Sequence, residues 1–428
     1  MLLTLTIQTA ACQVSDNGHG STQTDVVCRD PAGLSFSAPE LWTVVSPEFE
    51  AYTQWLTESP YRLGKSNLIE RSVDDIAVFG DHLYAGLGDY SYNTGSRFCV
   101  AEGGSCLYED APGHGIPVYR FAKGDPQAEH KWVIQQEEIQ RFRQTGRALF
   151  VPPIDPTLGD PAPGCVDPAS EAFCLDEAAR DHERFITSTF YKLEGGQWHS
   201  QAKLEGSNHG FDVAVAGRRI YGSGSGKPPG SPDSDDSYAM IWRSDDNGET
   251  FTIDLVDDAA TGYRRVHTLL ALGDTVVALG THVDDEVSAR YVGSAGQWRE
   301  IEEWRGPDGI LQSQPVDQQR GLIWGTGGLW SVTMAGGQVT LSDELLDPDT
   351  SIVDVDLLCE GDVLVLTWYW DEGFMYSVQR STDLVSWQTI ATSEATMRLS
   401  SFAYWDGSLF FGGREGELYR AAGQPERR

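Results

Sequence analysis

One short pattern recurs along the chain: an apolar stretch, a tight turn, and a second apolar stretch that often ends in glycine. Most of the turns contain an adjacent Gly-Asp or Asp-Gly pair, which supplies the positive φ angle that a tight hairpin requires. Apolar residues on both sides of the turn indicate strands that are buried on both faces. The clear copies occupy residues 75–87, 212–225, 268–281, 356–367 and 401–414, and weaker copies occupy residues 140–151 and 310–326.

A second hairpin usually follows each copy, as at residues 241–251. Four short strands per unit, repeated about seven times, are typical of a β-propeller, in which small sheets called blades stand in a ring. We therefore predict an all-β, seven-bladed β-propeller, with six or eight blades as close alternatives. A collection of unrelated hairpins or sandwiches is the competing interpretation. The unequal spacing favours the propeller, because the longest gaps hold two cysteine-bracketed insertions, near residues 97–115 and 153–186.

The two ends of the repeat array complement each other. The last unit ends at residues 417–420, its third strand, and therefore lacks a fourth strand. Residues 40–45 form a strand-like segment that belongs to no unit. Adding this segment to the last blade would remove two open sheet edges, so we predict that it closes the ring. A helix is expected next, beginning at Pro47 with Ser46 as its N-cap.

The cysteines point to an oxidising compartment. Four of the seven lie in two close pairs that bracket short loops, which indicates disulfide bonds. Residues 1–12 end in Thr9-Ala10-Ala11-Cys12, which resembles a bacterial lipobox, and this resemblance implies a signal segment and lipidation of Cys12. Residues 13–27 then form a polar tether, and residues 28–428 a single propeller domain. The predicted disulfides are Cys99–Cys106, Cys165–Cys174 and, with Cys12 lipidated, Cys28–Cys359. We expect export to the periplasm or the cell surface, with an outer-membrane lipoprotein as one form.

The formal net charge is −33, from 64 acidic and 31 basic residues. Such a surface repels phosphate backbones, so nucleic acid is not an expected partner. We expect a monomer that meets a membrane only through the N-terminal lipid. No cofactor or metal site is predicted, and calcium alone stays open, because carboxylates are its preferred ligands. The nearest match to a calcium loop, residues 233–236, lacks the glycine and the distal glutamate of an EF-hand.

One turn resembles a known structural motif. Ser244, Asp246, Gly248 and Phe251 match the Asp-box, S-x-D-x-G-x-T-W, with Phe in place of Trp. The Asp-box is a turn between the third and fourth strands of blades in sialidase-like (BNR repeat) propellers, so the resemblance implies the fold and a structural role for these residues. It does not imply sialidase chemistry, because the Arg-Ile-Pro segment of sialidases is absent and no catalytic residue is selected. Degenerate relatives occur at residues 381–387, 196–198 and 296–298.

The candidate site is a face of the ring rather than a motif. In propellers, the loops that enter the first strand and those that join the second strand to the third lie on one face. Here these loops carry aromatic, carboxylate, amide and guanidinium groups, which suit a glycan or peptide ligand. The candidate ligand-binding residues are Asp89, Tyr92, Asn93, His209, Arg265, His267, His282, Asp284, Trp368, Trp370 and Arg414.

The favoured function is non-catalytic binding of a glycan or protein, and two other functions stay open. A glycoside hydrolase or lyase acting on a sugar polymer would need two carboxyls within roughly 5–10 Å, with a perturbed pKa. A scaffold for an envelope assembly would present a large apolar patch away from the ring centre. The binding function instead predicts exposed aromatic side chains on the loop-rich face.

Overall fold

The fold is taken from a computed structural model. The described residues are 31, 34–44, 71–89, 101–102, 105–106, 116–134, 139–145, 148–152, 188–231, 237–257, 264–282, 289–301, 304, 311–325, 328–342, 345–346, 350–358, 361–370, 374–395, 398–413 and 416–425. The expected helix after Pro47 and the acidic stretch at 233–236 lie outside these residues.

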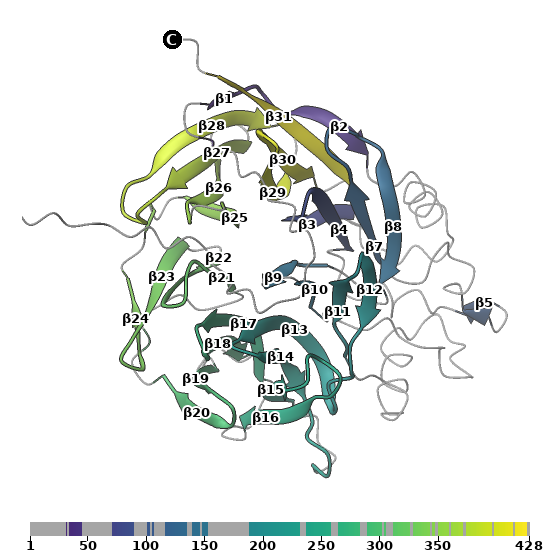
Figure 1. Ribbon diagram of the computed structural model, residues 1–428, viewed down its shortest axis with the longest axis vertical. Coiled ribbons are helices and arrows are strands. Elements are labelled where there is room, and N and C mark those ends of the chain that lie inside the picture. The colour runs from purple at the N-terminus through teal and green to yellow at the C-terminus, as the bar shows by residue number, and fades with distance from the viewer. Residues whose placement is uncertain are drawn as a thin grey trace, which may run out of the picture.

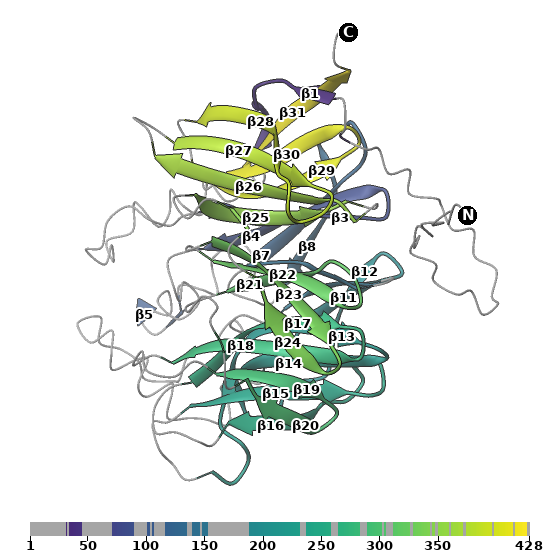
Figure 2. The same ribbon diagram turned by 90° about the vertical axis from the view of Figure 1, so that its left-hand side faces the viewer.

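Seven antiparallel sheets stand in a ring, which confirms the predicted seven-bladed β-propeller (Figure 1). Within blades 1 to 6 the strands pair in chain order, from an inner strand near the ring centre to an outer strand at the rim. Seen from the side, the strands run across the thickness of the ring (Figure 2). The weaker sequence copies at 140–151 and 310–326 are the inner hairpins of the second and fifth blades.

The strand bounds follow the repeat, blade by blade. Blade 1 has β3 (Arg71–Phe79), β4 (His82–Asp89), β7 (Ile116–Phe121) and β8 (Ala128–Ile134), and blade 2 has β9 (Arg143–Thr145), β10 (Ala148–Val151), β11 (Tyr191–Glu194) and β12 (Gln197–Ser200). Blade 3 has β13 (Ser207–Ala216), β14 (Arg219–Gly226), β15 (Tyr238–Ser244) and β16 (Thr252–Asp257), and blade 4 has β17 (Arg264–Leu272), β18 (Thr275–His282), β19 (Arg290–Ser294) and β20 (Gln297–Glu300).

The second half of the ring continues in the same order. Blade 5 has β21 (Gln312–Pro315), β22 (Arg320–Gly325), β23 (Gly328–Ala335) and β24 (Gln338–Leu341), and blade 6 has β25 (Ser351–Leu357), β26 (Val363–Trp370), β27 (Phe374–Ser381) and β28 (Gln388–Ala395). Blade 7 has β29 (Leu399–Trp405), β30 (Ser408–Gly413) and β31 (Glu417–Pro425), joined by β1 (Leu34–Phe36) and β2 (Glu40–Val44). A separate two-stranded hairpin is formed by β5 (Ala101–Glu102) and β6 (Ser105–Cys106).

The hydrophobic core is divided into layers between neighbouring blades. Between blades 3 and 4, for example, Tyr221 and Ile241 pack against Val266 and Leu269. A comparable buried cluster lies between every other pair of neighbouring blades, including blades 7 and 1. Strand β14 is buried along nearly its whole length because it faces such a layer on each side. The continuous apolar character of the repeat is therefore explained by this two-sided packing.

The predicted closure of the ring is confirmed. Strand β2 pairs antiparallel with β31, with Leu41 opposite Tyr419 and Thr43 opposite Leu418. Trp42 packs against Phe121 of blade 1 and Phe410 of blade 7, with ring centroids 5.2 and 5.0 Å apart. Strand β1 also pairs with β31, further along it, which the sequence pattern did not indicate. Figure 1 shows both N-terminal strands beside β31 at the rim of blade 7.

Candidate functional site

The two faces of the ring have different elements. Each inner strand begins on one face, where the second strand of the same blade ends, as Ser207 pairs with Gly226 in blade 3. We call this the loop face, since the predicted binding loops attach here. On the opposite face, which we call the hairpin face, a tight turn joins the first two strands of a blade, as at Gly217 and Gly273.

Four side chains from blades 3 and 4 meet near the start of their inner strands, and we call them the loop-face cluster. His209 stacks on Phe211 with ring centroids 6.1 Å apart, and His267 lies 4.4 Å from the same ring. The guanidinium of Arg265 lies 5.5 Å from the centre of the Phe211 ring. Burial lowers the pKa of His267 to about 3, and the positive charges of Arg265, Arg141 and His209 add to this effect. Three of the predicted ligand-binding residues therefore come together, around a phenylalanine that the sequence reasoning did not select.

The other candidate residues are more dispersed. Trp368 is partly buried and packs against the core between blades 6 and 7, as a structural residue would. Asp89, His282 and Trp370 are the last residues of β4, β18 and β26, which places their backbones on the loop face. The remaining candidates, Tyr92, Asn93, Asp284 and Arg414, lie outside the described residues. So do Cys12, Cys28, Cys99, Cys165, Cys174 and Cys359, while Cys106 ends β6.

An irregularity repeats in the inner strands. The pairing register shifts near the start of the inner strand in blades 1, 3, 4, 6 and 7. A β-bulge of this kind turns one residue out of the regular ladder and re-aims its neighbours. The residue that resumes the pairing is polar in all five strands. These residues are Asp75, Asp212, Thr268, Asp354 and Ser401.

Three of them, which we call the interblade aspartates, bind the neighbouring blade. In Asp75, Asp212 and Asp354, one carboxylate oxygen accepts the next residue's backbone N–H. The other oxygen accepts an N–H from the inner strand of the following blade. The interblade donors are Phe142, Leu269 and Phe402, in that order. Both oxygens are thus occupied by peptide groups, so these aspartates hold adjacent blades together.

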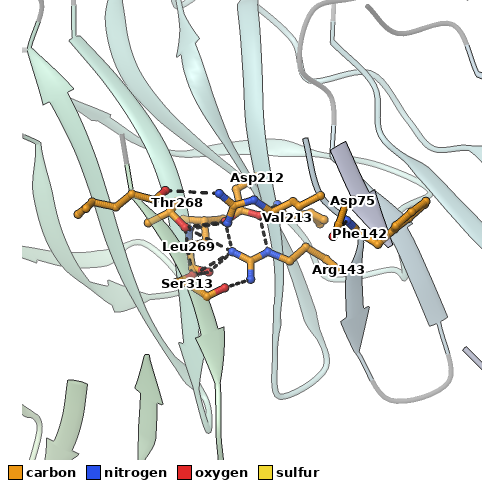
Figure 3. A network of polar contacts seen from close by, with 10 residues as sticks. Asp75, Phe142, Arg143, Asp212, Val213, Thr268, Leu269 and Ser313 are labelled. Atoms are coloured by element: carbon orange, nitrogen blue, oxygen red, sulfur yellow. Dashed lines mark hydrogen bonds and ion pairs between the residues drawn. The ribbon is translucent and has the colours of Figure 1, made fainter. Parts of the chain in front are cut away.

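Arg143 reaches from blade 2 to three other blades (Figure 3). Its Nε donates to Asp212 Oδ1 at 2.7 Å, and its Nη2 donates to the other carboxylate oxygen. Further donations reach Thr268 in blade 4 and the hydroxyl and carbonyl oxygens of Ser313 in blade 5. Arg141 lies 3.6 Å from Asp212 and donates to Thr268. We call these five residues the central network.

The central network holds two guanidinium groups and one carboxylate. Burial acts to raise the pKa of Asp212, but the charges of Arg143 and Arg141 outweigh it, so the pKa lies below its ordinary value. Burial lowers the pKa of Arg141 to about 10. Arg141, Arg143 and Asp212 are each almost fully buried. The network therefore joins blades 2 to 5 around one buried carboxylate that is paired with two arginines.

Three other carboxyls show the opposite shift. Burial raises the pKa of Asp75 to about 7 and that of Asp356 to about 6. The pKa of Asp354 is also raised, by burial and then by the charge of Asp75. Asp356 accepts a hydrogen bond from the backbone N–H of Tyr404 in blade 7. The hydrolase hypothesis requires perturbed carboxyls, and these have the right kind of shift, but peptide groups occupy their oxygens.

The turn at Ser244 to Phe251 is held by its own side chains. Ser244 Oγ donates to Asp246 Oδ1 at 2.7 Å and accepts the backbone N–H of Gly248 at 2.8 Å. Thr250 donates both its N–H and its hydroxyl to the Asp246 carboxylate. The hydroxyl and N–H of Thr250, with the Ser244 hydroxyl, lower the pKa of Asp246 to about 2. Phe251 packs edge-on against Phe190 of the neighbouring blade.

A second turn of the same kind joins β27 to β28. Ser381 Oγ accepts the N–H of Leu384 at 2.8 Å, and Asp383 accepts those of Val385 and Ser386. Both turns lie between the third and fourth strands of a blade and on the outer part of the ring. Their geometry makes them structural turns, distant in the fold from the inner strands that form the centre.

Two further features are absent from the described residues. No group of three or more His, Cys, Asp and Glu side chains in the described part of the chain is arranged to hold a metal ion. Among the same residues, no helix has both the length and the apolar character needed to cross a membrane.

Comparison with known proteins identifies no family for this chain. No protein-family model matches the chain, and no curated protein matches its sequence. Among solved structures, the WD40 β-propeller domain of Doa1 is 10% identical, with a TM-score of 0.47 over 90% of this chain and 97% of that chain. YCF48 from Cyanidioschyzon merolae is 11% identical, with a TM-score of 0.43 over 84% and 97%. At such identities the assignment of the fold rests on the strand pairing described above.

Proposed function

We propose that this chain is a non-catalytic binding propeller that holds a glycan or protein ligand with an acidic group on its loop face. The observation that carries this proposal is the loop-face cluster, in which His209, Arg265 and His267 gather around Phe211. This cluster places one guanidinium group and two imidazole rings around an aromatic ring, in a protein whose formal net charge is −33. A glycan with a carboxylate or sulfate fits such a cluster, because charge-assisted hydrogen bonds to guanidinium groups are strong and directional.

A glycan array that displays matched acidic and neutral glycans tests this proposal. We expect the acidic members to bind, and Arg265→Gln to weaken that binding by about tenfold or more, since it removes one charge-assisted contact. Arg219→Gln is the matched control, because Arg219 pairs with Asp245 near the turn joining β15 to β16. Equal binding by wild type and Arg265→Gln would contradict the assigned site. A wholly negative array would reject the glycan and leave an acidic protein ligand.

A hydrolase or lyase is the second candidate, and the raised pKa values of Asp75, Asp354 and Asp356 support it. Their saturation by backbone N–H groups weighs against it, because a catalytic carboxyl needs a free oxygen that can reach the substrate. We expect no release of reducing or unsaturated ends when the protein is incubated with acidic polysaccharides. Release that disappears in Asp354→Asn would replace the binding function with an enzymatic one.

We also propose that the chain is an exported lipoprotein of the Asp-box class. The hydrogen bonds around Ser244 and Asp246 support the motif, and the lipobox-like Thr9-Ala10-Ala11-Cys12 supports the anchor. Disulfides Cys99–Cys106, Cys165–Cys174 and Cys28–Cys359 belong to the same proposal. Metabolic labelling with a fatty acid should mark the wild type and not Cys12→Ser, and the intact mass without reductant should be lower by six hydrogens than the reduced mass. Equal labelling of the wild type and Cys12→Ser would reject lipidation of Cys12. Equal masses with and without reductant would reject the three disulfides.

A further inference from the structure

A cavity of about 640 Å³ opens on the hairpin face, on the opposite side of the ring from the loop-face cluster. It is lined by residues of blades 2 to 5, from the inner strands and the turns that follow them. Its volume lies in the range of small-molecule binding sites. The loop-face proposal does not use this cavity.

The cavity has a polar floor whose charge is already neutralised. Arg143 lines the inner end, and its guanidinium binds Asp212 through two nitrogens as well as Ser313. Leu269 and Val213, both almost completely buried, complete this end. Arg143 is the one cationic side chain among the described residues that line the cavity, and it is paired with Asp212.

The walls are aliphatic and the rim is built from rigid turns. Val215, Ala271 and Val316 line the walls. The rim turn of blade 5 is fixed by Asp317, which accepts two backbone N–H groups and the Nε of Arg320. The turns of blades 3 and 4 are in close contact, since a Cβ atom added to Gly217 would lie 2.2 Å from Oδ1 of Asp274. A preformed site of this kind costs little ordering on binding.

The polar side chains that remain for a ligand include several hydrogen-bond acceptors. Asp274 is exposed at the rim, and it carries a formal negative charge. The amide side chains of Gln144, Gln314 and Gln318 add carbonyl acceptors at the wall and rim. None of the described residues that line the cavity is aromatic, so they offer no ring on which a sugar could stack. The combination is an aliphatic space with carboxylate and amide groups at its opening.

We propose that this cavity is a second binding site, which takes an aliphatic chain ending in a protonated amine. The methylene groups lie against Val215, Ala271 and Val316, and the ammonium group donates hydrogen bonds to Asp274 and the amide carbonyls. Two sources offer this chemistry: a free diamine or polyamine, and a lysine side chain of another protein.

Isothermal titration with three probes of equal length tests the chemistry. The probes are 1,5-diaminopentane, 1,5-pentanediol and glutarate, which carry positive, neutral and negative ends. The buffer contains 150 mM salt, because the Debye length is then about 8 Å and general attraction of the diamine to the acidic surface is screened. We expect measurable binding of the diamine alone. A diamine that binds no more tightly than the diol would overturn the proposal. A short peptide with one lysine distinguishes the sources: binding equal to the diamine supports a protein ligand, and no binding supports a free amine.

Two variants locate the site. Asp274→Asn should weaken diamine binding by about tenfold, because a charged acceptor becomes neutral. Asp245→Asn, a change at an exposed carboxylate away from the cavity, should leave the affinity unchanged. Ala271→Leu should also weaken binding by filling the wall. Equal affinity in the wild type and Asp274→Asn, or equal losses in Asp274→Asn and Asp245→Asn, would overturn the proposed site. Loop-face glycan binding should be the same in all of these proteins, so the two sites can fail independently.

Discussion

Replacing Arg143 by methionine tests the role of the central network in holding the blades together. The change keeps most of the side-chain volume but removes every hydrogen bond that Arg143 donates to blades 3, 4 and 5. It leaves Asp212, which has no exposed surface, as an ionised carboxylate without its main counter-charge. Breaking a buried ion pair by removing one partner costs about 3–5 kcal/mol, so we expect the free energy of unfolding to fall by that amount.

Urea unfolding followed by tryptophan fluorescence at pH 7.5 measures the loss. The matched control is Arg219→Met, because Arg219 and Asp245 form an ion pair with side chains 38% and 56% exposed, and such pairs contribute about 1 kcal/mol or less. Arg143→Met/Asp212→Leu should recover little of the loss, since it leaves Arg141 and the N–H groups of Val213 and Leu269 without the carboxylate. A loss for Arg143→Met no larger than that of Arg219→Met would refute the assigned role of the central network.

Three further outcomes are expected. Trp42→Ala should lower the free energy of unfolding by about 2–4 kcal/mol, because the indole packs between blades 1 and 7. The control, Leu41→Ala, should change this free energy little, since the Leu41 side chain is 58% exposed. Equal effects of the two changes in urea unfolding would contradict the closure of the ring by β2. Phe251→Ala should lower the free energy of unfolding by about 2–3 kcal/mol, because it removes the contact with Phe190. Val385→Ala should change this free energy very little, since the Val385 side chain is 81% exposed. A thermal melt in which Val385→Ala is destabilised as much as Phe251→Ala would exclude a packing role for Phe251. The stability of the wild type relative to Asp75→Asn should fall as the pH rises from 5 to 8. Asp75 has a folded pKa near 7, above the ordinary 3.8, so over this range the folded protein holds a proton that the unfolded chain has already released. His267, whose pKa is lowered, acts in the other direction in both proteins, and a stability difference that stays constant with pH would contradict the raised pKa of Asp75.

The blades could be predicted because their physical requirements are local. A turn glycine and two apolar stretches specify a hairpin within about a dozen residues, and each hairpin is repeated. Even the weak copies at 140–151 and 310–326 became inner hairpins, since their apolar residues pack into the same interblade layers. The closing strand was predictable by complementarity, because one unit lacked a strand and one segment lacked a unit.

The central residues were missed because their roles depend on neighbours far apart in the sequence. Arg143 binds Asp212 and Ser313 across three blades, and nothing near Arg143 indicates either partner. A signal was nevertheless present for the interblade residues. Asp75, Asp212 and Thr268 each stand five positions before the glycine of the hairpin turn, and a polar residue at a fixed place in an apolar repeat deserves an explanation. On the loop face, His209 and His267 lie against Phe211, which reads in sequence as an ordinary core residue.

Strand β31 pairs with three strands at once: β30 in its own blade, and β1 and β2 from the beginning of the described chain. During synthesis, the six preceding blades leave the ribosome before β31 does, and the layer between blades 7 and 1 stays incomplete until then. The most distant contacts of the molecule are therefore the last to form, which slows folding and leaves two sheet edges open to other chains in the meantime. In the finished protein, peeling β31 away would release both N-terminal strands in one step. Resistance to pulling or to proteolysis at the C-terminal end thus measures the integrity of the whole circle.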